Sequence, residues 1–187
     1  MLKRPLAFVH EILKQHVSVN DTVIDATVGN GNDTVLLASL VGKGGKVYGF
    51  DIQEQAIKIS TEKLLLTGLL SQTKLIQDGH ENIDKYIPDN DNISAITFNL
   101  GYLPKSDKSI ITTANTTIQA IKKGMIRLRK GGLITIMVYY GHEGGVEEKI
   151  DVTKFVTQLP QEEYNVLKYE YINQQNNPPF LYIIEKK

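Results

Sequence analysis

The sequence contains no cysteine among its 187 residues. This absence excludes disulfide frameworks, thiolate zinc sites and cysteine nucleophiles. An excess of charge is also missing, because 21 Lys and Arg residues balance 21 Asp and Glu residues. Proteins that coat long stretches of nucleic acid usually carry a strong basic excess. We therefore expect any contact with nucleic acid to occur through a local patch.

Long hydrophobic runs are missing as well. The amino-terminal segment MLKRPLAFVHEILKQHV begins with basic residues, and His10, Glu11 and Lys14 interrupt its apolar positions. It therefore matches neither the apolar region of a signal peptide nor a membrane-spanning helix. A hydrophobic fraction of 41% and a charged fraction of 22% are typical of globular proteins. We expect residues 1–187 to form one cytoplasmic domain without membrane contact, since this length suits a single core.

Short apolar runs alternate with segments of helical periodicity along most of the chain. The predicted strands are 22–26, 46–51, 73–77, 93–100 and 133–140, and the predicted helices are 5–17, 33–41, 53–67, 109–128 and 146–158. Two further strands, 164–173 and 180–186, are joined by QQNNPP, which leaves no room for a crossover helix and predicts an antiparallel pair. This order predicts an α/β fold, a Rossmann-like, mostly parallel, doubly wound sheet with one antiparallel C-terminal edge strand.

The first predicted strand runs into a glycine-containing turn, DATVGNGNDT, at residues 25–34. Glycines permit a tight turn and let a ligand approach the backbone at the start of the next helix. Thr34 stands where a dinucleotide fingerprint has its third glycine, which disfavours a pyrophosphate and a nicotinamide-dependent reductase. Asp25 would repel a pyrophosphate and attract an ammonium group, unless it is only a strand-end or helix-capping residue. Asp51 ends the second strand, where it is placed to hold the two hydroxyls of a ribose or to serve as an ordinary turn residue.

A cationic amino-acid end and a ribose occur together in S-adenosylmethionine, so the two carboxylates around the glycine loop favour this cofactor. The third strand ends in Gln77, Asp78, Gly79 and His80. In this fold an acid after the third strand commonly receives the exocyclic amine of adenine, although a polar turn has the same pattern. His80 is a candidate contact to the base or a surface residue.

The fourth strand ends at Asn99, which we expect beside the glycine loop, because ligands of such sheets bind beyond the carboxyl ends of the strands at the switch point. An asparagine offers a carbonyl acceptor and an amide donor, which can orient a target amine. Methyl transfer from a sulfonium is an in-line displacement, so holding the acceptor in line supplies much of the catalysis. A turn-capping asparagine is the alternative interpretation.

The fifth strand ends in YYGHEGG, residues 139–145. A tyrosine can stack on an extruded base, and His142 can contact the substrate or relay a proton. Because neighbours on a strand alternate faces, we expect only one tyrosine to face the pocket, and core packing is the alternative interpretation of Tyr139. Lys105 and Lys108 are candidate phosphate contacts. The cations Lys122, Lys123, Arg127, Arg129 and Lys130 are interpreted as a solvated helix end before Gly131-Gly132.

Four motifs together resemble one family: DATVGNGNDT, FNLGYLP, YYGHEGG and NNPPFLYIIE. They are similar to the small bacterial methyltransferases formerly called rRNA methylases, the YtqB-like or MnmM family, over essentially the whole chain. The resemblance implies a class I methyltransferase fold, S-adenosylmethionine as donor and a tRNA anticodon stem-loop as substrate. It implies N-methylation of the 5-aminomethyl group of 5-aminomethyl-2-thiouridine at the wobble position (34), giving 5-methylaminomethyl-2-thiouridine, by a homodimer.

The resemblance also implies cofactor contacts from Asn30, Asn32, Asp51, Gln53, Asp78 and His80. Residue pattern and resemblance together predict a cofactor site made of Asp25, Thr27, Gly29, Asn30, Gly31, Asn32, Asp33, Thr34, Asp51, Gln53, Asp78, Gly79, His80 and Asn99. The predicted catalytic residues are Asn99, Tyr102, Tyr140 and His142, and the predicted RNA contacts are Lys105, Lys108, Tyr140 and His142. No metal site is predicted.

The segment after the fourth strand departs from the wider group of amino-methylating enzymes. Leu100 and Gly101 replace their two prolines, and Tyr102 keeps the aromatic position. The amine is therefore expected to be held differently. An alkylamine must also lose a proton before attack, and no residue stands out as general base. A methyltransferase of rRNA or of a small-molecule amine, and a non-catalytic nucleotide-binding module, are the alternatives.

Overall fold

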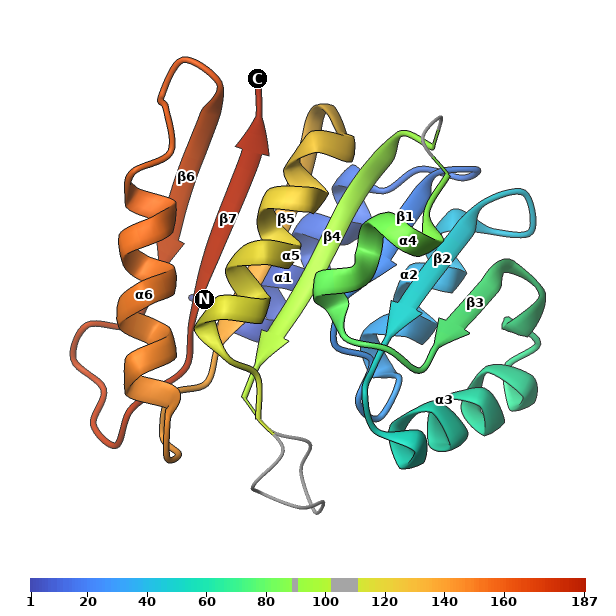
Figure 1. Ribbon diagram of the computed structural model, residues 1–187, viewed down its shortest axis with the longest axis horizontal. Coiled ribbons are helices and arrows are strands. Elements are labelled where there is room, and N and C mark those ends of the chain that lie inside the picture. Colours follow the sequence, from blue (N-terminus) through green and yellow to red (C-terminus); the bar gives the residue numbers. More distant parts are fainter. Residues whose placement is uncertain (89–90, 102–110) are drawn as a thin grey trace.

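The computed structural model describes residues 1–88, 91–101 and 111–187, and its strands form one sheet of order β3-β2-β1-β4-β5-β7-β6 (Figure 1). The strands are β1 (Thr22–Asp25), β2 (Lys46–Phe50), β3 (Thr73–Ile76), β4 (Ile93–Leu100), β5 (Leu128–Val138), β6 (Tyr164–Tyr169) and β7 (Phe180–Lys186). Strands β1 to β5 pair in parallel, whereas β7 is antiparallel to both β5 and β6. The predicted fold class and C-terminal hairpin are therefore confirmed, and the reversed strand β7 lies between β5 and β6.

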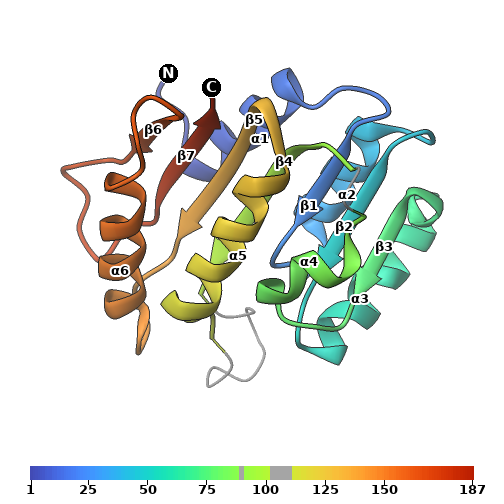
Figure 2. The same ribbon diagram turned by 45° about the horizontal axis from the view of Figure 1, so that its top comes forward.

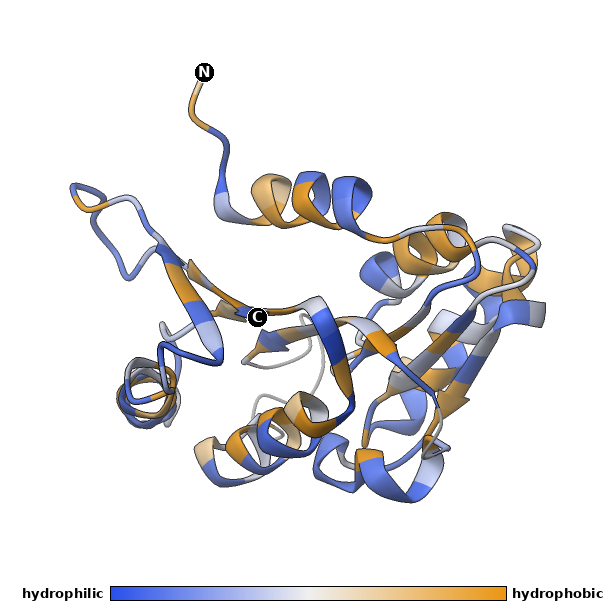
Figure 3. Ribbon diagram, turned by 90° about the horizontal axis from the view of Figure 1, so that it is seen from above, coloured by the Kyte–Doolittle hydropathy of each residue, from blue (hydrophilic) through white to orange (hydrophobic). Residues whose placement is uncertain are grey.

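Helices cover both faces of the sheet, as Figures 1 and 3 show. They are α1 (Pro5–His16), α2 (Asn32–Val41), α3 (Glu54–Leu66), α4 (Ile83–Tyr86), α5 (Ala114–Arg127) and α6 (Gly145–Thr157). Figure 2 shows α4, α5 and α6 in front of the sheet, with α1 and α2 behind it. No helix in the described ranges is long and apolar enough to cross a membrane.

Two apolar cores result, one on each face of the sheet. Along β4, Ile96 and Phe98 pack into the cluster beneath α4, α5 and α6, while Ala95 packs into the cluster that holds Leu13 of α1 and Leu64 of α3. Successive side chains of a strand point to opposite faces, so a strand covered on both sides must be apolar throughout. This double burial explains the continuous apolar runs of the sequence.

The predicted boundary between the fourth long helix and the fifth strand is wrong. Helix α5 ends at Arg127, and β5 begins at Leu128 rather than after the two glycines. Leu128 pairs with Ile93 of β4 and is buried in the core, which draws this residue into the sheet. Consequently Arg129 and Lys130 belong to the strand and do not cap the helix. Helix α4, which follows β3, was not predicted.

Candidate active site

The glycine loop joins β1 to α2 at the carboxyl edge of the sheet. Gly29 and Gly31 adopt φ angles of 52° and 72°, a left-handed conformation that favours glycine. The N–H of Gly31 donates to the carbonyl of Val28 over 2.8 Å and closes the turn, and the N–H of Val28 donates to the carbonyl of Phe50 in β2 over 3.0 Å. The loop is thereby tied to the end of β2.

Asp51, which directly follows β2, stabilises the contact between the glycine loop and that strand. Its two carboxylate oxygens accept the N–H groups of Gly29 over 2.8 Å and of Gln53 over 2.9 Å. Burial raises the pKa of Asp51, and these two N–H groups offset only part of that effect. The carboxylate is therefore fixed in place, with further lone pairs able to accept ligand hydroxyls.

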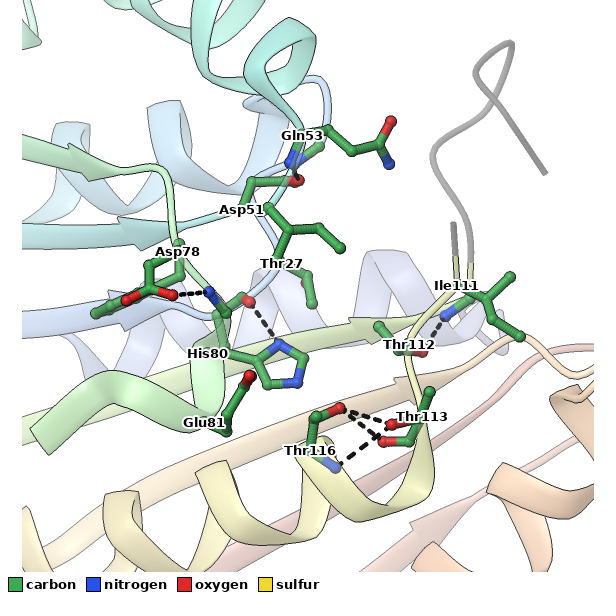
Figure 4. Close-up of a pocket in the computed structure, with 16 residues that line it drawn as sticks. Thr27, Asp51, Gln53, Asp78, His80, Glu81, Ile111, Thr112, Thr113 and Thr116 are labelled. Atoms are coloured by element: carbon green, nitrogen blue, oxygen red, sulfur yellow. Dashed lines mark hydrogen bonds between the residues drawn. The ribbon is translucent and has the colours of Figure 1, made fainter. Parts of the chain in front are cut away.

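Asp51 lines a cavity of about 280 Å³ (Figure 4). Its lining includes six predicted cofactor residues besides Asp51, namely Thr27, Gly29, Gln53, Asp78, Gly79 and His80. Asp78 also has a local role, because it accepts hydrogen bonds from Tyr86 over 2.7 Å and from Asn82 over 2.9 Å. These bonds, that of Tyr86 first, lower the pKa of Asp78 and anchor the turn into α4.

His80 brings an unpaired acceptor to this cavity. Its Nδ1 lies 3.0 Å from the carbonyl of Ala26, as Figure 4 shows, so Nδ1 carries the hydrogen and Nε2 keeps a lone pair. The side chain is 8% exposed, and no described residue bonds to the buried Nε2. Burial lowers the pKa of His80, which keeps the ring neutral. A buried acceptor beside the Asp51 carboxylate fits the hydroxyl and amine donors of an adenosine, so the residues present suit the predicted cofactor. The surface interpretation of His80 is wrong.

Asp25 and Thr34 lie beneath the loop. Both are fully buried, and neither belongs to the lining of the cavity at Asp51 or of the larger cavity described below. Asp25 accepts the Thr34 hydroxyl over 2.6 Å and the N–H of Thr27 over 3.2 Å. Burial, followed by the nearby charge of Asp33, raises the pKa of Asp25 to about 7. This arrangement matches the strand-end alternative, in which Asp25 supports the loop and does not meet an ammonium group directly.

Helix α3 packs directly against the glycine loop. A Cβ built on Gly31 would lie 2.6 Å from Ser60 Oγ, and that hydroxyl donates to the carbonyl of Gly29 over 3.1 Å. Lys63 donates to the carbonyl of Asn30 over 2.6 Å and to Asn32 Oδ1 over 2.7 Å. The close approach of α3 therefore requires glycine at residue 31, a reason that the sequence pattern did not reveal.

A second cavity of about 700 Å³ shares Thr27 and Gly29 with the first. Its lining contains three of the four predicted catalytic residues, namely Asn99, Tyr140 and His142, and the predicted cofactor residues Asn30, Asn32 and Asp33. His10, Tyr139 and Asn177 line it as well. The backbone N–H of Asn99 donates to Thr27 Oγ1 over 2.7 Å, which fixes the end of β4 against the loop. Asn99 thus lies beside the glycine loop, where the sequence predicts it.

Both tyrosines of the YYGHEGG segment line this larger cavity, so the expectation that only one of them faces the pocket is wrong. Strand β5 ends at Val138, and the alternation of faces does not continue beyond it. Tyr139 is 38% exposed, and burial followed by the charge of Asp33 raises the pKa of Tyr139. Tyr140 lies under Lys149, whose Nζ is 3.9 Å from the ring centroid. His142 has its ring nitrogens near the carbonyls of Glu143 and Tyr139, at 2.9 and 2.8 Å.

Two polar contacts near the cavities escaped the sequence analysis. His10 of α1 lies against Asp33, 23 residues away, and nothing in the sequence links the two. Glu148 of α6 is buried and accepts the hydroxyls of Thr112 over 2.6 Å and Thr117 over 2.8 Å. Burial raises the pKa of Glu148. Of the remaining candidates, Tyr102, Lys105 and Lys108 lie outside the described residues.

The glycine loop, the acid that ends β2 and Asn99 at the end of β4 define a class I methyltransferase. Residues 47–185 match the family described as "putative rRNA methylase", and the chain belongs to that family. A "putative rRNA-methylase" from Clostridium thermocellum is 49% identical, with a TM-score of 0.97 and full coverage of both chains. A methyltransferase from Streptococcus mutans, solved with SAH, is 48% identical, with a TM-score of 0.91 and full coverage of both chains.

The tRNA (mnm5s2U34)-methyltransferase, chloroplastic, of Arabidopsis thaliana is 38% identical over 194 residues, which cover 99% of this chain and 70% of that protein. The predicted family and enzyme class are thus confirmed. S-adenosylmethionine is the cofactor, since the Streptococcus mutans relative binds its demethylated form, SAH.

Proposed function

We propose that this enzyme methylates the amino nitrogen of 5-aminomethyl-2-thiouridine at the wobble position (34) of tRNA, giving 5-methylaminomethyl-2-thiouridine. The observation that carries the proposal is the carboxamide of Asn99 at the larger cavity, next to the glycine loop. An amide carbonyl accepts a hydrogen bond from an amine and so orients its lone pair. The name of the Arabidopsis thaliana relative, which specifies mnm5s2U34 of tRNA, supports the choice of substrate.

The smaller cavity would hold the adenosine part of S-adenosylmethionine. Asp51 would accept the ribose hydroxyls, while Asp78, Gly79 and the Nε2 of His80 would meet the base. Asn30 and Asn32, at the rim shared with the larger cavity, would contact the methionine part. When bound, the cofactor supplies an electrophilic methyl group on a sulfonium centre.

The larger cavity would hold the modified uridine. Tyr139 and Tyr140 offer aromatic faces on which an extruded base can stack, a contact worth about 1–3 kcal/mol. The substrate ammonium must lose one proton before its nitrogen can attack, so the amine is most reactive when it is deprotonated in the site. Asn99 then holds one N–H of the neutral amine, which leaves the lone pair free.

We also propose a cellular location and an oligomeric state for the enzyme. We place the enzyme in the cytoplasm, as a homodimer of one-domain chains that receives the tRNA anticodon stem-loop. Sedimentation of the purified protein tests the dimer, because a monomeric mass at assay concentration would contradict it.

Incubation of the protein with S-adenosylmethionine and an anticodon stem-loop that carries 5-aminomethyl-2-thiouridine tests the substrate. We expect nucleoside mass spectrometry to show one added methyl group on that nucleoside. A matched stem-loop that carries 2-thiouridine lacks the amine and should remain unmodified. Transfer to ribosomal RNA or to small amines, with none to the stem-loop, would move the assignment to those alternatives. Binding of the cofactor without transfer to any acceptor would favour a non-catalytic module.

A further inference from the structure

A chain of hydrogen bonds joins three elements at the larger cavity. Nε2 of His10, on α1, lies 2.7 Å from Oδ1 of Asp33, on α2. Oδ2 of the same carboxylate accepts Nδ2 of Asn99, at the end of β4, over 2.7 Å. All three side chains line the cavity. Both oxygens of Asp33 are therefore engaged, each by a residue from a different element.

The carboxylate of Asp33 determines the orientation of the Asn99 carboxamide. An ionised carboxylate can only accept hydrogen bonds, so it must face the amide nitrogen and not the carbonyl oxygen. The carbonyl oxygen of Asn99 is then directed away from Asp33, and no described residue donates to it. This leaves an acceptor at the cavity in one fixed orientation.

Hydrogen bonds to Asp33 favour its ionised form. Burial favours the neutral acid, but the hydrogen bonds of His10 and Asn99 outweigh it and lower the pKa of Asp33. The titratable groups near it are His10, Asp25 of β1 and Tyr139. Burial, and then the charge of Asp33, raises the pKa of both Asp25 and Tyr139. His142 lines the same cavity. The negative charge of Asp33 thus acts both on Asp25 beneath the loop and on Tyr139 at the cavity.

On the basis of the proposed amine substrate, we propose that His10 and Asp33 are positioning residues that hold the carbonyl oxygen of Asn99 toward the reacting nitrogen. His10 fixes one oxygen of Asp33, and Asp33 fixes the carboxamide of Asn99. Neither residue exchanges a proton with the substrate in this role. Helix α1, which precedes the sheet, thereby becomes part of the machinery for methyl transfer.

Single-turnover rates on the aminomethylated stem-loop test this arrangement. His10→Leu removes the donor to Asp33, and we expect the rate of transfer to fall by about 10-fold or more, since small misplacements of a reacting group are costly. His10→Gln restores an N–H donor and should recover most of that loss. Cofactor affinity, measured by calorimetry, should change by less than about 2-fold in either variant, because the effect lies in the transition state. A rate for His10→Leu equal to that of the wild type would overturn the proposal.

His16 provides a matched control. It lies on the same helix, and its Nε2 bonds to the carbonyl of Ser94 over 3.1 Å, outside both cavities. His16→Leu removes a similar hydrogen bond from α1 and should leave the rate close to that of the wild type. Equal losses in His10→Leu and His16→Leu would mean that the loss comes from displacement of α1 as a whole, and the proposal would be wrong.

A double-mutant cycle separates positioning from general disturbance. If His10 acts through Asn99, the combined variant His10→Leu/Asn99→Ala should be no slower than Asn99→Ala alone. Multiplicative losses would show that His10 acts elsewhere. Asp33→Asn leaves the orientation of Asn99 undetermined, and it should lower the rate like His10→Leu, with the same non-additivity toward Asn99→Ala.

A readout without substrate distinguishes failure of this inference from failure of the proposed function. The side-chain amide protons of Asn99 give an NMR signal, and their exchange with water is slowed by the bond to Asp33. We expect faster exchange in Asp33→Asn and His10→Leu, and near wild-type exchange in His10→Gln. If the wild type does not methylate the stem-loop and the exchange pattern still appears, only the substrate assignment fails. An unprotected amide in the wild type would refute the hydrogen-bond chain itself.

Discussion

The contribution of Asp25 to the unfolding free energy of this protein should fall as pH rises toward neutrality. Burial first, and then the charge of Asp33, raises the pKa of Asp25 from 3.8 to about 7 in the folded protein. A folded-state pKa above the unfolded value means that the native protein binds the proton more tightly. The stabilisation from Asp25 is therefore fully present below the unfolded value and is lost as pH rises through the folded value.

The size of the effect follows from the gap between the two pKa values. The gap is about three pKa units, and each unit corresponds to about 1.4 kcal/mol, so the contribution changes by about 4 kcal/mol. Asp25→Asn removes the titration and keeps the shape. The new carboxamide can accept the N–H of Thr27 and donate to the hydroxyl of Thr34. We expect this variant to be more stable than the wild type at pH 8.

Urea unfolding followed by circular dichroism, from pH 4 to pH 8, measures this difference. The stability of the wild type relative to Asp25→Asn should decrease steadily with pH. Asp151 is exposed on α6, so Asp151→Asn serves as a control that leaves the slope unchanged. If Asp25→Asn shows the same pH slope as the wild type, Asp25 is already ionised at pH 4 and its burial does not govern its charge.

Three further changes test the cofactor site and the reaction site. Asp51→Ala should weaken cofactor binding by about 1–3 kcal/mol in calorimetry, since a charged acceptor for the ribose is lost, and unchanged affinity in a folded variant would remove Asp51 from the site. Gly31→Val should abolish cofactor binding and lower the melting temperature, because the valine side chain meets Ser60 and the φ angle at residue 31 is left-handed. Adding Ser60→Gly to Gly31→Val should restore part of the stability. Normal cofactor binding in Gly31→Val would contradict the role of the loop. Asn99→Ala should reduce single-turnover methylation by about 100-fold with little change in cofactor affinity, and near wild-type turnover would mean that another group orients the amine. The rate of the wild type should also climb with pH until the bound amine is deprotonated, and a pH-independent chemical step would argue against an alkylamine substrate.

The sheet could be predicted because its determinants are local. Apolar runs bounded by turns reveal the parallel strands, and the short QQNNPP connection permits only a hairpin between β6 and β7. The start of β5 could not be predicted in this way. Leu128 joins the sheet because it pairs with Ile93, 35 positions earlier in the chain. This tertiary contact outweighs the tendency of Gly131 and Gly132 to form a turn before the strand.

The same distinction between local and tertiary determinants applies to the candidate site. Asp51 and Asn99 could be predicted because the end of a strand fixes where a side chain lies. The burial of Asp25, the exposure of Tyr139 and the contact of His10 with Asp33 depend on how separate elements pack. A single sequence carries no signal for such contacts.

The placement of β7 between β5 and β6 also constrains the order of assembly during synthesis on the ribosome. Strand β6 is made before β7 but pairs only with β7 among the described strands, so it must wait for residues 180–186 to emerge. The edge of β5 stays unpaired over the same interval, since Val138 pairs with Phe180. The segment with Tyr139 and Tyr140 follows directly after that pair. Strands β1 to β4, which carry the glycine loop, can thus form while the part of the sheet that leads to Tyr139 and Tyr140 is still incomplete.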